Sequence, residues 1–450
     1  MGRRSRTRAL GLWMNGLFVG TWSLHPQQGD TLHYAQAWLD SAQGRPLSLS
    51  LPFLPGNKPL TGPAVSAYFD NLLPDSRDIR DRIARRYRTD TTSPFDLLTH
   101  IGRDCVGALQ IMPPDMEPSD VTHVNATTLT ESEVAQYLRA SIGNQPATGS
   151  KDQADEFRIS IAGAQEKTAL LYTEGKWCRP HGATATTHIL KLPVGLVGNM
   201  KFDLRESIEN EWLCSRILAA YGLPVAQCEP LQFEDIKVLA VRRFDRQWTH
   251  SADKTPWLVR LPQEDLCQAS GLPPALKYES DGGPGVDRIM SILDGSVQRD
   301  RDRRLFFQAQ LLFWMLCAPD GHAKNFSLFL RPAGAYELTP LYDVLSAYPL
   351  LGEGPGRLSP FRAKMAMAVR STNAHWRMQE IQRRHWVSIG ERHGLTTEDG
   401  RSAAVLIDQI IERTPAIIRS VRAELPPDFP EALAESILGG LGAAAERVAG

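Results

Sequence analysis

The feature that most constrains the fold is a change of sequence pattern near residue 262. Before it, short alternating or β-branched segments predict strands; after it, apolar residues recur at helical spacing. Phe306–Cys317 is apolar on all sides, which predicts a buried helix. The predicted strands are Phe157–Ile161, Thr168–Tyr172, Thr187–Leu192 and Lys237–Phe244. A block of strands followed by a block of helices predicts an α+β protein.

The 450 residues are enough for two or three domains. Four parts are expected. Residues 1–115 form an α+β subdomain that opens with a hairpin at Leu10–Val19 and contains a helix over Pro74–Tyr87; residues 116–156 form a linker region; residues 157–262 form a strand-rich lobe; and residues 263–450 form an all-helical lobe. The further helices that the pattern predicts are Glu131–Ala140, Glu206–Tyr221, His375–His393, Ser402–Leu425 and Pro430–Val448.

Charge and apolar content limit the possible partners and compartments. The formal net charge is -1, so no global attraction to nucleic acid or membrane is expected. The longest apolar run, Leu311–Ala318, is too short to span a bilayer. Arginines precede the first apolar stretch, as in a signal peptide, but Asn15-Gly16 interrupts it in the manner of a hairpin turn. Six scattered cysteines without C-x-x-C spacing predict reduced thiols and a cytoplasmic protein.

The strongest chemical signal is Asp320-Gly-His-Ala-Lys-Asn325, followed by Asp343. Phosphoryl transfer from ATP needs a carboxylate that orients the attacking hydroxyl, oxygen ligands that hold Mg²⁺, and a cation near the transferring phosphate. Protein kinases place an Asn five positions after the catalytic Asp and a second, metal-binding Asp later. Asp320 and Asn325 have this spacing, and Lys324 stands where kinases often have a catalytic-loop cation. A polar surface turn is the alternative, which the apolar flanks and Asp343 disfavour.

Two further signals lie in the strand-rich block. Lys191 lies within an apolar strand, where its charge needs a partner. A kinase uses such a lysine to hold ATP phosphates and to pair with a helix glutamate, and the sequence leaves open whether that is Glu206, Glu209 or Glu211. The loop between two strands is small enough to approach phosphates, yet it matches neither the glycine-rich kinase loop nor a P-loop. Its residues are Ala162, Gly163, Ala164, Gln165, Glu166, Lys167 and Thr168.

Together these segments resemble the HipA toxins, the kinase components of bacterial HipBA toxin–antitoxin modules. The resemblance covers nearly the whole chain in the right order. The segments that carry it are Tyr68–Asp75, Gly102–Ala108, Phe157–Ala169, His188–Pro193, Arg243–Arg246, Leu261–Cys267, Lys277–Glu279, Asp281–Gly285, Asp320–Ser327 and Leu341–Ser346.

The resemblance implies a divergent two-lobed kinase fold and a Ser/Thr protein kinase that uses Mg-ATP. It implies a protein substrate, an aminoacyl-tRNA synthetase in the best-known case, whose phosphorylation blocks translation and leads to growth arrest and persistence. It also implies a HipB-like helix-turn-helix antitoxin dimer, through which the chain would reach operator DNA.

The resemblance also assigns residues. Asp320 is the expected catalytic base, Asn325 and Asp343 are expected to hold Mg²⁺, and Ser160 is the expected site of autophosphorylation that switches the kinase off. The expected nucleotide-binding residues outside the Ala162–Thr168 loop are Lys191, Arg242, Phe244, His322 and Tyr342.

Two other functions are compatible with the same motifs. A small-molecule kinase of the aminoglycoside type shares the Asp-x4-Asn pattern and the later Asp. A pseudokinase that acts as a co-repressor with a DNA-binding partner would bind nucleotide without turnover. The presence of Asp320, Asn325, Asp343 and Lys191 argues against the pseudokinase.

Overall fold

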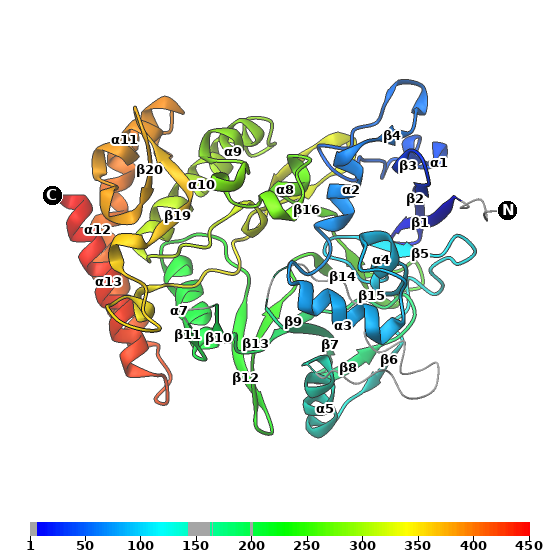
Figure 1. The fold of residues 1–450 in the computed structure, drawn as a ribbon, viewed down its shortest axis with the longest axis horizontal. Helices are drawn as coiled ribbons and strands as arrows, with labels where there is room; N and C mark the ends of the chain where they lie inside the picture. The colour runs from blue at the N-terminus through cyan, green and yellow to red at the C-terminus, as the bar shows by residue number, and fades with distance from the viewer. Residues whose placement is uncertain (1–6, 143–162, 164, 199–200) are drawn as a thin grey trace. The chain divides into compact units, whose positions relative to one another are not determined.

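The computed structural model describes residues 7–142, 163, 165–198 and 201–450 (Figure 1). The predicted strand Phe157–Ile161 lies outside the described residues. The chain divides into two compact units, each built from three segments. Unit 1 comprises Met1–Leu192, Leu231–Leu276 and Ser327–Tyr336, and unit 2 comprises Pro193–Pro230, Lys277–Phe326 and Glu337–Gly450.

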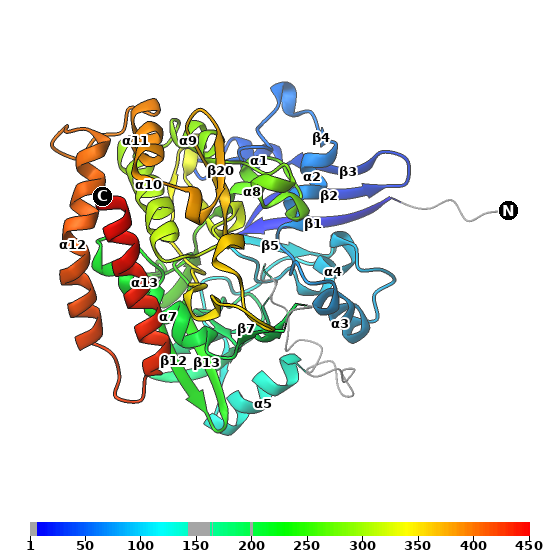
Figure 2. The same ribbon diagram turned by 60° about the vertical axis from the view of Figure 1, so that its left-hand side comes forward.

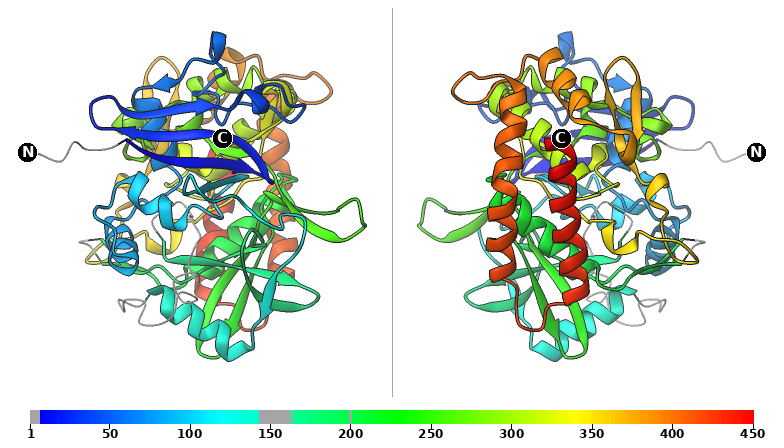
Figure 3. Two further views of the ribbon diagram at one scale, coloured as in Figure 1. Left: turned by 90° about the vertical axis from the view of Figure 1, so that its right-hand side faces the viewer. Right: turned by 90° about the vertical axis from the view of Figure 1, so that its left-hand side faces the viewer.

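Unit 1 opens with a five-stranded antiparallel sheet in the order β4-β3-β2-β1-β5 (Figure 3, left). Its strands are β1 (Arg8–Met14), β2 (Leu17–His25), β3 (Gly29–Tyr34), β4 (Leu60–Thr61) and β5 (Leu109–Met112). The predicted hairpin is confirmed: Asn15 and Gly16 join β1 to β2 with φ angles of 48° and 83°, the left-handed pair that a tight hairpin turn requires. Trp22 of β2 stacks on Phe69 in the core, with ring centroids 3.8 Å apart.

Helices α1 (Gln36–Leu39), α2 (Pro63–Asp70), α3 (Arg77–Tyr87) and α4 (Pro94–Ile101) accompany this sheet. α3 begins three residues later than the sequence predicts. The reason is the cap at Ser76, whose hydroxyl oxygen accepts a hydrogen bond from the Ile79 amide at 3.4 Å.

The second sheet of the unit has six strands in the order β12-β13-β9-β7-β8-β6. Its strands are β6 (Ala126–Thr128), β7 (Lys167–Thr173), β8 (Lys176–Pro180), β9 (His188–Lys191), β12 (Cys228–Phe233) and β13 (Ile236–Arg242). Helix α5 (Glu131–Ile142) packs Val134 and Leu138 against Leu170 and Leu190 of this sheet. The predicted strands near 168–172, 187–192 and 237–244 and the helix near 131–140 are thus confirmed, although β13 ends at Arg242.

The remaining strands of unit 1 are short. β14 (Arg246–His250) pairs with β15 (Pro256–Arg260), and β16 (Gln263–Asp265) pairs with β17 (Ser327–Leu330). Helix α8 (Leu266–Ala269) follows β16 directly, capped by the Asp265 carboxylate, which accepts from the Gln268 amide at 2.8 Å.

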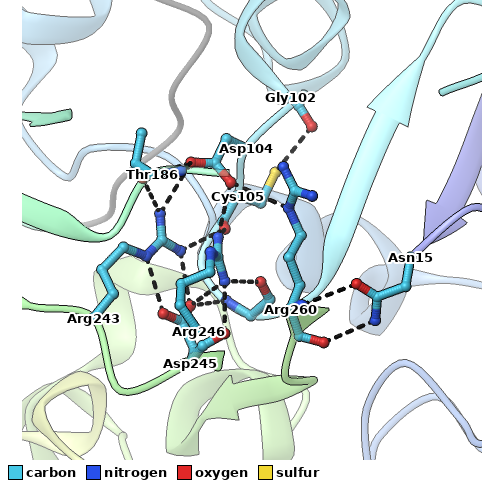
Figure 4. A network of polar contacts seen from close by, with 10 residues as sticks. Asn15, Gly102, Asp104, Cys105, Thr186, Arg243, Asp245, Arg246 and Arg260 are labelled. Carbon is cyan, nitrogen blue, oxygen red and sulfur yellow. Dashed lines mark hydrogen bonds and ion pairs between the residues drawn. The ribbon is translucent and has the colours of Figure 1, made fainter. Parts of the chain in front are cut away.

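A buried charge network lies between segments of unit 1 that are far apart in sequence (Figure 4). The carboxylates of Asp104 and Asp245 meet the guanidinium groups of Arg243, Arg246 and Arg260, and all five residues are at most 8% exposed. Three cations and two anions therefore lie out of water, which is tolerable only because nearly every charge has a partner. Asp245 and Glu264, although both lie near the ends of short strands, are buried.

Six α-helices are described in unit 2 (Figure 2). They are α7 (Ser207–Ala220), α9 (Val286–Leu293), α10 (Arg299–Met315), α11 (Arg383–Arg392), α12 (Ala403–Ala423) and α13 (Glu431–Ala449). Figures 2 and 3 show α12 and α13 side by side, in agreement with their many close approaches. The predictions of α7, α12, α13 and the buried α10 are confirmed, and α10 begins seven residues before Phe306.

The expectation of an all-helical lobe over residues 263–450 is wrong. That stretch contains β16, β17, β18 (Tyr336–Leu338), β19 (Lys364–Arg370) and β20 (Ala374–Arg377). Of these strands, β19 and β20 lie wholly in unit 2, together with β10 (Gly195–Val197) and β11 (Phe202–Leu204). The predicted helix His375–His393 starts only at Arg383. β20 pairs with β19, whose apolar residues Met365–Val369 are buried, and this tertiary pairing overrides the local helical pattern.

All six cysteines are free thiols, and five of them are buried. Within the described ranges, none of the helices combines the length and the apolar character needed to cross a bilayer.

Candidate functional site

The loop that carries Asp320 emerges from the end of the buried helix α10. Cys317 takes a left-handed conformation (φ 49°), and the Ala318 amide donates to the Phe313 carbonyl at 2.7 Å, which reverses the chain. A Cβ on Gly321 would lie 2.5 Å from Cδ2 of Phe313, so only glycine lets the loop pass this close to the helix. The loop is therefore held against a rigid element.

Asn325 joins the two predicted acidic positions. Its side-chain amide donates to the Asp320 carbonyl at 2.9 Å and to the Asp343 carbonyl at 3.2 Å. Because both N–H groups are used on backbone oxygens, the amide oxygen is the atom left to face a cation. Asn325 is 4% exposed, whereas the Asp320 side chain is 58% exposed.

The segment around Asp343 is tied to the same structure. Asp343 has a φ of 62°, a conformation that Asp tolerates better than most residues. The Tyr342 hydroxyl donates to the carbonyl of the buried Lys324 at 2.8 Å. Ser346 exchanges two hydrogen bonds of 2.8 Å with Asn210 of α7, and its hydroxyl donates to the Leu316 carbonyl at 2.6 Å. α7, the end of α10 and the Asp343 segment therefore form one framework.

The Asp320 carboxylate has two aromatic neighbours. The Tyr278 hydroxyl donates to Asp320 Oδ1, and Nε2 of the buried His322 lies 3.8 Å from the same oxygen. The Tyr278 and His322 rings meet edge to face, with centroids 5.0 Å apart. Sequence reasoning gave Tyr278 no role, although the Lys277–Glu279 segment was one of the matching motifs.

Unit 1 holds the other predicted residues. β7 and β9 pair so that Lys167 lies opposite Lys191, and Lys191 is 6% exposed. The loop before β7 is fastened to the strand after it: Gln165 Nε2 donates to the Leu192 carbonyl at 2.5 Å, and the Leu192 amide donates to the Glu166 carbonyl at 3.0 Å.

The same loop contacts the N-terminal part of unit 1. Gly163 has a φ of 109° and accepts a hydrogen bond from the Asp75 amide at 3.0 Å, and Arg82 of α3 forms an ion pair with Glu166. Thr168 lies buried in β7. The predicted positions Ser160, Ala162 and Ala164 fall outside the described residues.

Two of the predicted nucleotide-binding residues, Arg242 and Phe244, lie at the end of β13 and just after it. Arg242 is exposed and pairs in register with His188, whose pKa falls to about 4 because the imidazole is buried and near Arg242. Phe244 is half-buried and meets Phe329 edge to face. Between them, Arg243 belongs to the buried network.

The donor set suits Mg²⁺ better than a transition metal. Among the described residues, no three His, Cys, Asp or Glu side chains gather as a metal cluster. Asn325 and Asp343 instead offer an amide oxygen and a carboxylate, and Mg²⁺ typically takes one or two protein oxygens and completes its shell with water and substrate phosphates. The residues present fit a magnesium ion that is held jointly with a nucleotide.

Comparison with known proteins finds two matching family profiles and several related sequences. The sequence profile of the HipA N-terminal domain matches residues 10–112, and that of the HipA-like C-terminal domain matches residues 159–418. The putative kinase Y4mE of Sinorhizobium fredii is 34% identical over 369 residues, covering 80% of this chain and 81% of the relative. The serine/threonine-protein kinase toxin HipA of Shewanella oneidensis is 27% identical over 380 residues, covering 81% and 79%.

A solved structure has the same fold. The complex of Shewanella oneidensis HipA with HipB and operator DNA contains a chain that matches with a TM-score of 0.77 and 23% identity, over 98% of this chain and 97% of that one. The C-terminal profile alone spans more than half of the sequence, and the resemblance inferred from the motifs is confirmed. The chain belongs to the HipA family.

Proposed function

We propose that this protein is a serine/threonine protein kinase toxin that transfers the γ-phosphate of Mg-ATP to another protein. The observation that supports it most is the bridging amide of Asn325, which fixes the backbones of Asp320 and Asp343 together in one unit. The kinase names of the relatives support the same reaction class.

The chain's own residues have separate tasks in this proposal. Asp320 accepts the proton of the acceptor hydroxyl, and its exposed carboxylate can meet a substrate from solution. Asn325 and Asp343 supply oxygens for Mg²⁺, which when bound neutralises phosphate charge. His322 and Lys324 belong to the same loop, and Tyr342 is hydrogen-bonded to it; we assign all three to the phosphate side of the site.

Unit 1 supplies the nucleotide contacts in this proposal. Lys191 binds ATP phosphates, and the Ala162–Thr168 loop covers them. Arg242 and Phe244 flank the adenine.

Ser160 is the proposed autophosphorylation site: a phosphate there adds about −1.5 to −2 charges near the ATP phosphates and disfavours the closed loop. The division of the chain at residues 115, 156 and 262 remains a prediction.

The partners follow from the family. The Shewanella oneidensis relative was solved with HipB and operator DNA. We propose a HipB-like antitoxin dimer for this chain, with DNA bound through that partner, because a net charge of -1 gives the kinase little affinity of its own for DNA. The proposed substrate is a translation component such as an aminoacyl-tRNA synthetase, and the proposed outcome is growth arrest and persistence.

Radiolabelled ATP tests the activity. The protein is incubated with γ-labelled ATP, Mg²⁺ and a whole-cell lysate, and the labelled band is identified by mass spectrometry. The proposal is supported if the parent enzyme labels a protein and the Asp320→Asn variant leaves that protein unlabelled. Label on an aminoglycoside and on no protein supports the small-molecule kinase, and nucleotide binding without any transfer supports the pseudokinase.

A calorimetric titration tests the metal assignment separately. Asp343→Ala is expected to lose Mg²⁺-dependent ATP binding, because a hard cation loses its carboxylate ligand. The matched control is Asp399→Ala, which removes an exposed carboxylate of unit 2 outside the site. Equal affinity of parent and Asp343→Ala for Mg-ATP would contradict the assignment.

A further inference from the structure

Tyr278 lies beside the proposed base, and the sequence predicted no role for it. Its hydroxyl donates to Asp320 Oδ1, and its ring rests on the buried His322. Tyr278 and Asp320 both belong to unit 2, yet they are 42 positions apart in sequence. The contact therefore depends on how the Lys277–Gly285 segment is attached to the catalytic loop.

Backbone hydrogen bonds fix the Lys277–Gly285 segment to the loop that carries Asp320. The Ala323 amide donates to the Lys277 carbonyl at 3.2 Å, which ties the residue before Tyr278 to the Asp320 loop. The Tyr278 carbonyl accepts from the Asp281 amide at 3.1 Å and from the Gly283 amide at 2.9 Å, which closes a tight turn. The backbone of Tyr278 is thus fixed before and after the side chain.

A second anchor holds the segment to β19. The Glu279 carboxylate accepts hydrogen bonds from the Ala368 amide at 2.7 Å and from Arg370 Nε at 3.0 Å. A Cβ on Gly285 would lie 2.3 Å from Cδ of Glu279, so the turn closes tightly around this side chain. A segment anchored in this way presents its tyrosine as a fixed donor rather than as a mobile lid.

We infer that Tyr278 is a positioning residue that holds the Asp320 carboxylate in its working orientation. The inference rests on the proposed kinase function. The tyrosine engages Oδ1, so Oδ2 is the oxygen that can accept the substrate proton. An exposed aspartate would otherwise rotate freely, and a base that is misplaced by about 1 Å loses roughly 100-fold in rate.

The chemistry assigns the tyrosine no proton transfer of its own. The acceptor oxygen bonds to the γ-phosphorus as the bond from that phosphorus to the β–γ bridging oxygen breaks, and ADP leaves. The acceptor proton passes to Asp320, while the Tyr278 hydroxyl keeps its proton and its hydrogen bond. Its effect is therefore on kcat, and nucleotide affinity is left unchanged.

The test is a double-mutant cycle with purified full-length protein, Mg²⁺ and γ-labelled ATP. Tyr278→Phe is expected to lower kcat for phosphate transfer by roughly 10- to 100-fold, while KM and Kd for Mg-ATP stay within about twofold of the parent values. In the Asp320→Asn background, Tyr278→Phe is expected to have no further effect. Tyr278→Ser, whose hydroxyl is too short to reach Asp320, is expected to lose as much as Tyr278→Phe.

Tyr221→Phe is the matched control, because it removes a hydroxyl bonded to Thr414 at 2.6 Å in the same unit, away from Asp320. It is expected to keep the parent kcat. An unchanged or raised kcat in Tyr278→Phe overturns the inference, as does an equal loss in the Asp320→Asn background or phosphate found on Tyr278 itself. If even the parent transfers no phosphate to any protein, it is the proposed kinase function that fails.

Discussion

Two aspartates, Asp104 in unit 1 and Asp320 in unit 2, show how one residue type serves different ends. The Asp104 side chain is 7% exposed and accepts hydrogen bonds from Arg243, Arg246 and Thr186 at 2.7–3.2 Å (Figure 4). The Asp320 side chain is 58% exposed and is bonded to the Tyr278 hydroxyl. Both lie in segments that resemble family motifs, so the motif alone does not tell them apart.

The two carboxylates differ in how far their charge and their acceptor positions are already satisfied by the protein. Asp104 is desolvated, but three arginines and Thr186 hold its pKa far below the ordinary value of 3.8, so it stays ionised and saturated. A carboxylate in that state is unsuited to take a substrate proton. Burial lowers the pKa of Arg246 to about 10, which still leaves the guanidinium charged at neutral pH. The network is therefore structural, whereas the exposed carboxylate of Asp320 is the one proposed to take part in the reaction.

The largest expected effect separates the two aspartates by activity. Asp320→Asn is expected to lower phosphate transfer about 10³-fold or more, because the proton acceptor is removed, which corresponds to about 4 kcal/mol in the barrier. Its melting temperature is expected to match that of the parent. Transfer rates and differential scanning calorimetry check both, and near-normal turnover would remove Asp320 from the mechanism.

Asp104→Asn is expected to behave in the opposite way. Three buried guanidinium groups would share the single charge of Asp245, and the free energy of unfolding is expected to fall by about 3 kcal/mol. Urea unfolding measures the loss. Activity per folded molecule is expected to persist, so a kinase-dead but fully stable variant would contradict the structural role.

Glu264 sharpens the comparison, because it is a buried acid that accepts a hydrogen bond from a backbone amide, whereas Asp104 accepts from arginines. Its Oε1 accepts from the Leu49 amide at 2.9 Å, and burial raises its pKa from 4.5 to about 8. The folded state thus keeps a proton that the unfolded chain releases. The resulting stabilisation is complete below pH 4.5 and is lost as the pH rises to about 8, at less than about 1.4 kcal/mol per pH unit.

Glu264→Gln removes this titration. The difference in unfolding free energy between parent and variant is expected to fall steadily between pH 5 and pH 8, as measured by urea unfolding at several pH values. A difference that is flat across this range would mean that Glu264 is ionised in the folded protein.

The smallest expected effect comes from an exposed carboxylate. Glu435 forms an ion pair with Arg422 at the surface of α13 and α12, with both side chains about half exposed. Water and salt screen such pairs, so Glu435→Gln is expected to change neither stability nor transfer measurably. A loss comparable to that of Asp104→Asn would show that burial is not what separates these carboxylates.

The sequence predicted those parts that depend on local pattern. Helices such as α7 and α13 and strands such as β7 and β9 carry their apolar period within the segment itself. The spacing of Asp320, Asn325 and Asp343 was readable because it spans one loop and a short pair of strands, although the roles of these residues stay predictions. The family was also recognisable, since its motifs follow one another along the chain.

What the sequence did not predict depends on distant partners. Asp245 looks like a loop carboxylate until Gly107, 138 positions away, donates its amide to it at 2.7 Å. β20 looks helical until β19 pairs with it. The contact of Tyr278 with Asp320 likewise depends on a turn and a strand that bring two remote segments together, and no local pattern encodes that.

The buried network has a consequence for the order in which the chain is made. Asp104 leaves the ribosome 142 residues before Arg246 and 156 residues before Arg260. At typical synthesis rates of about 5–20 residues per second, the aspartate waits for many seconds without its counter-charges. Burial of Asp104 is therefore unfavourable until the polypeptide has grown past residue 260, and in nascent chains halted earlier the segment around Asp104 should remain exposed and sensitive to proteases.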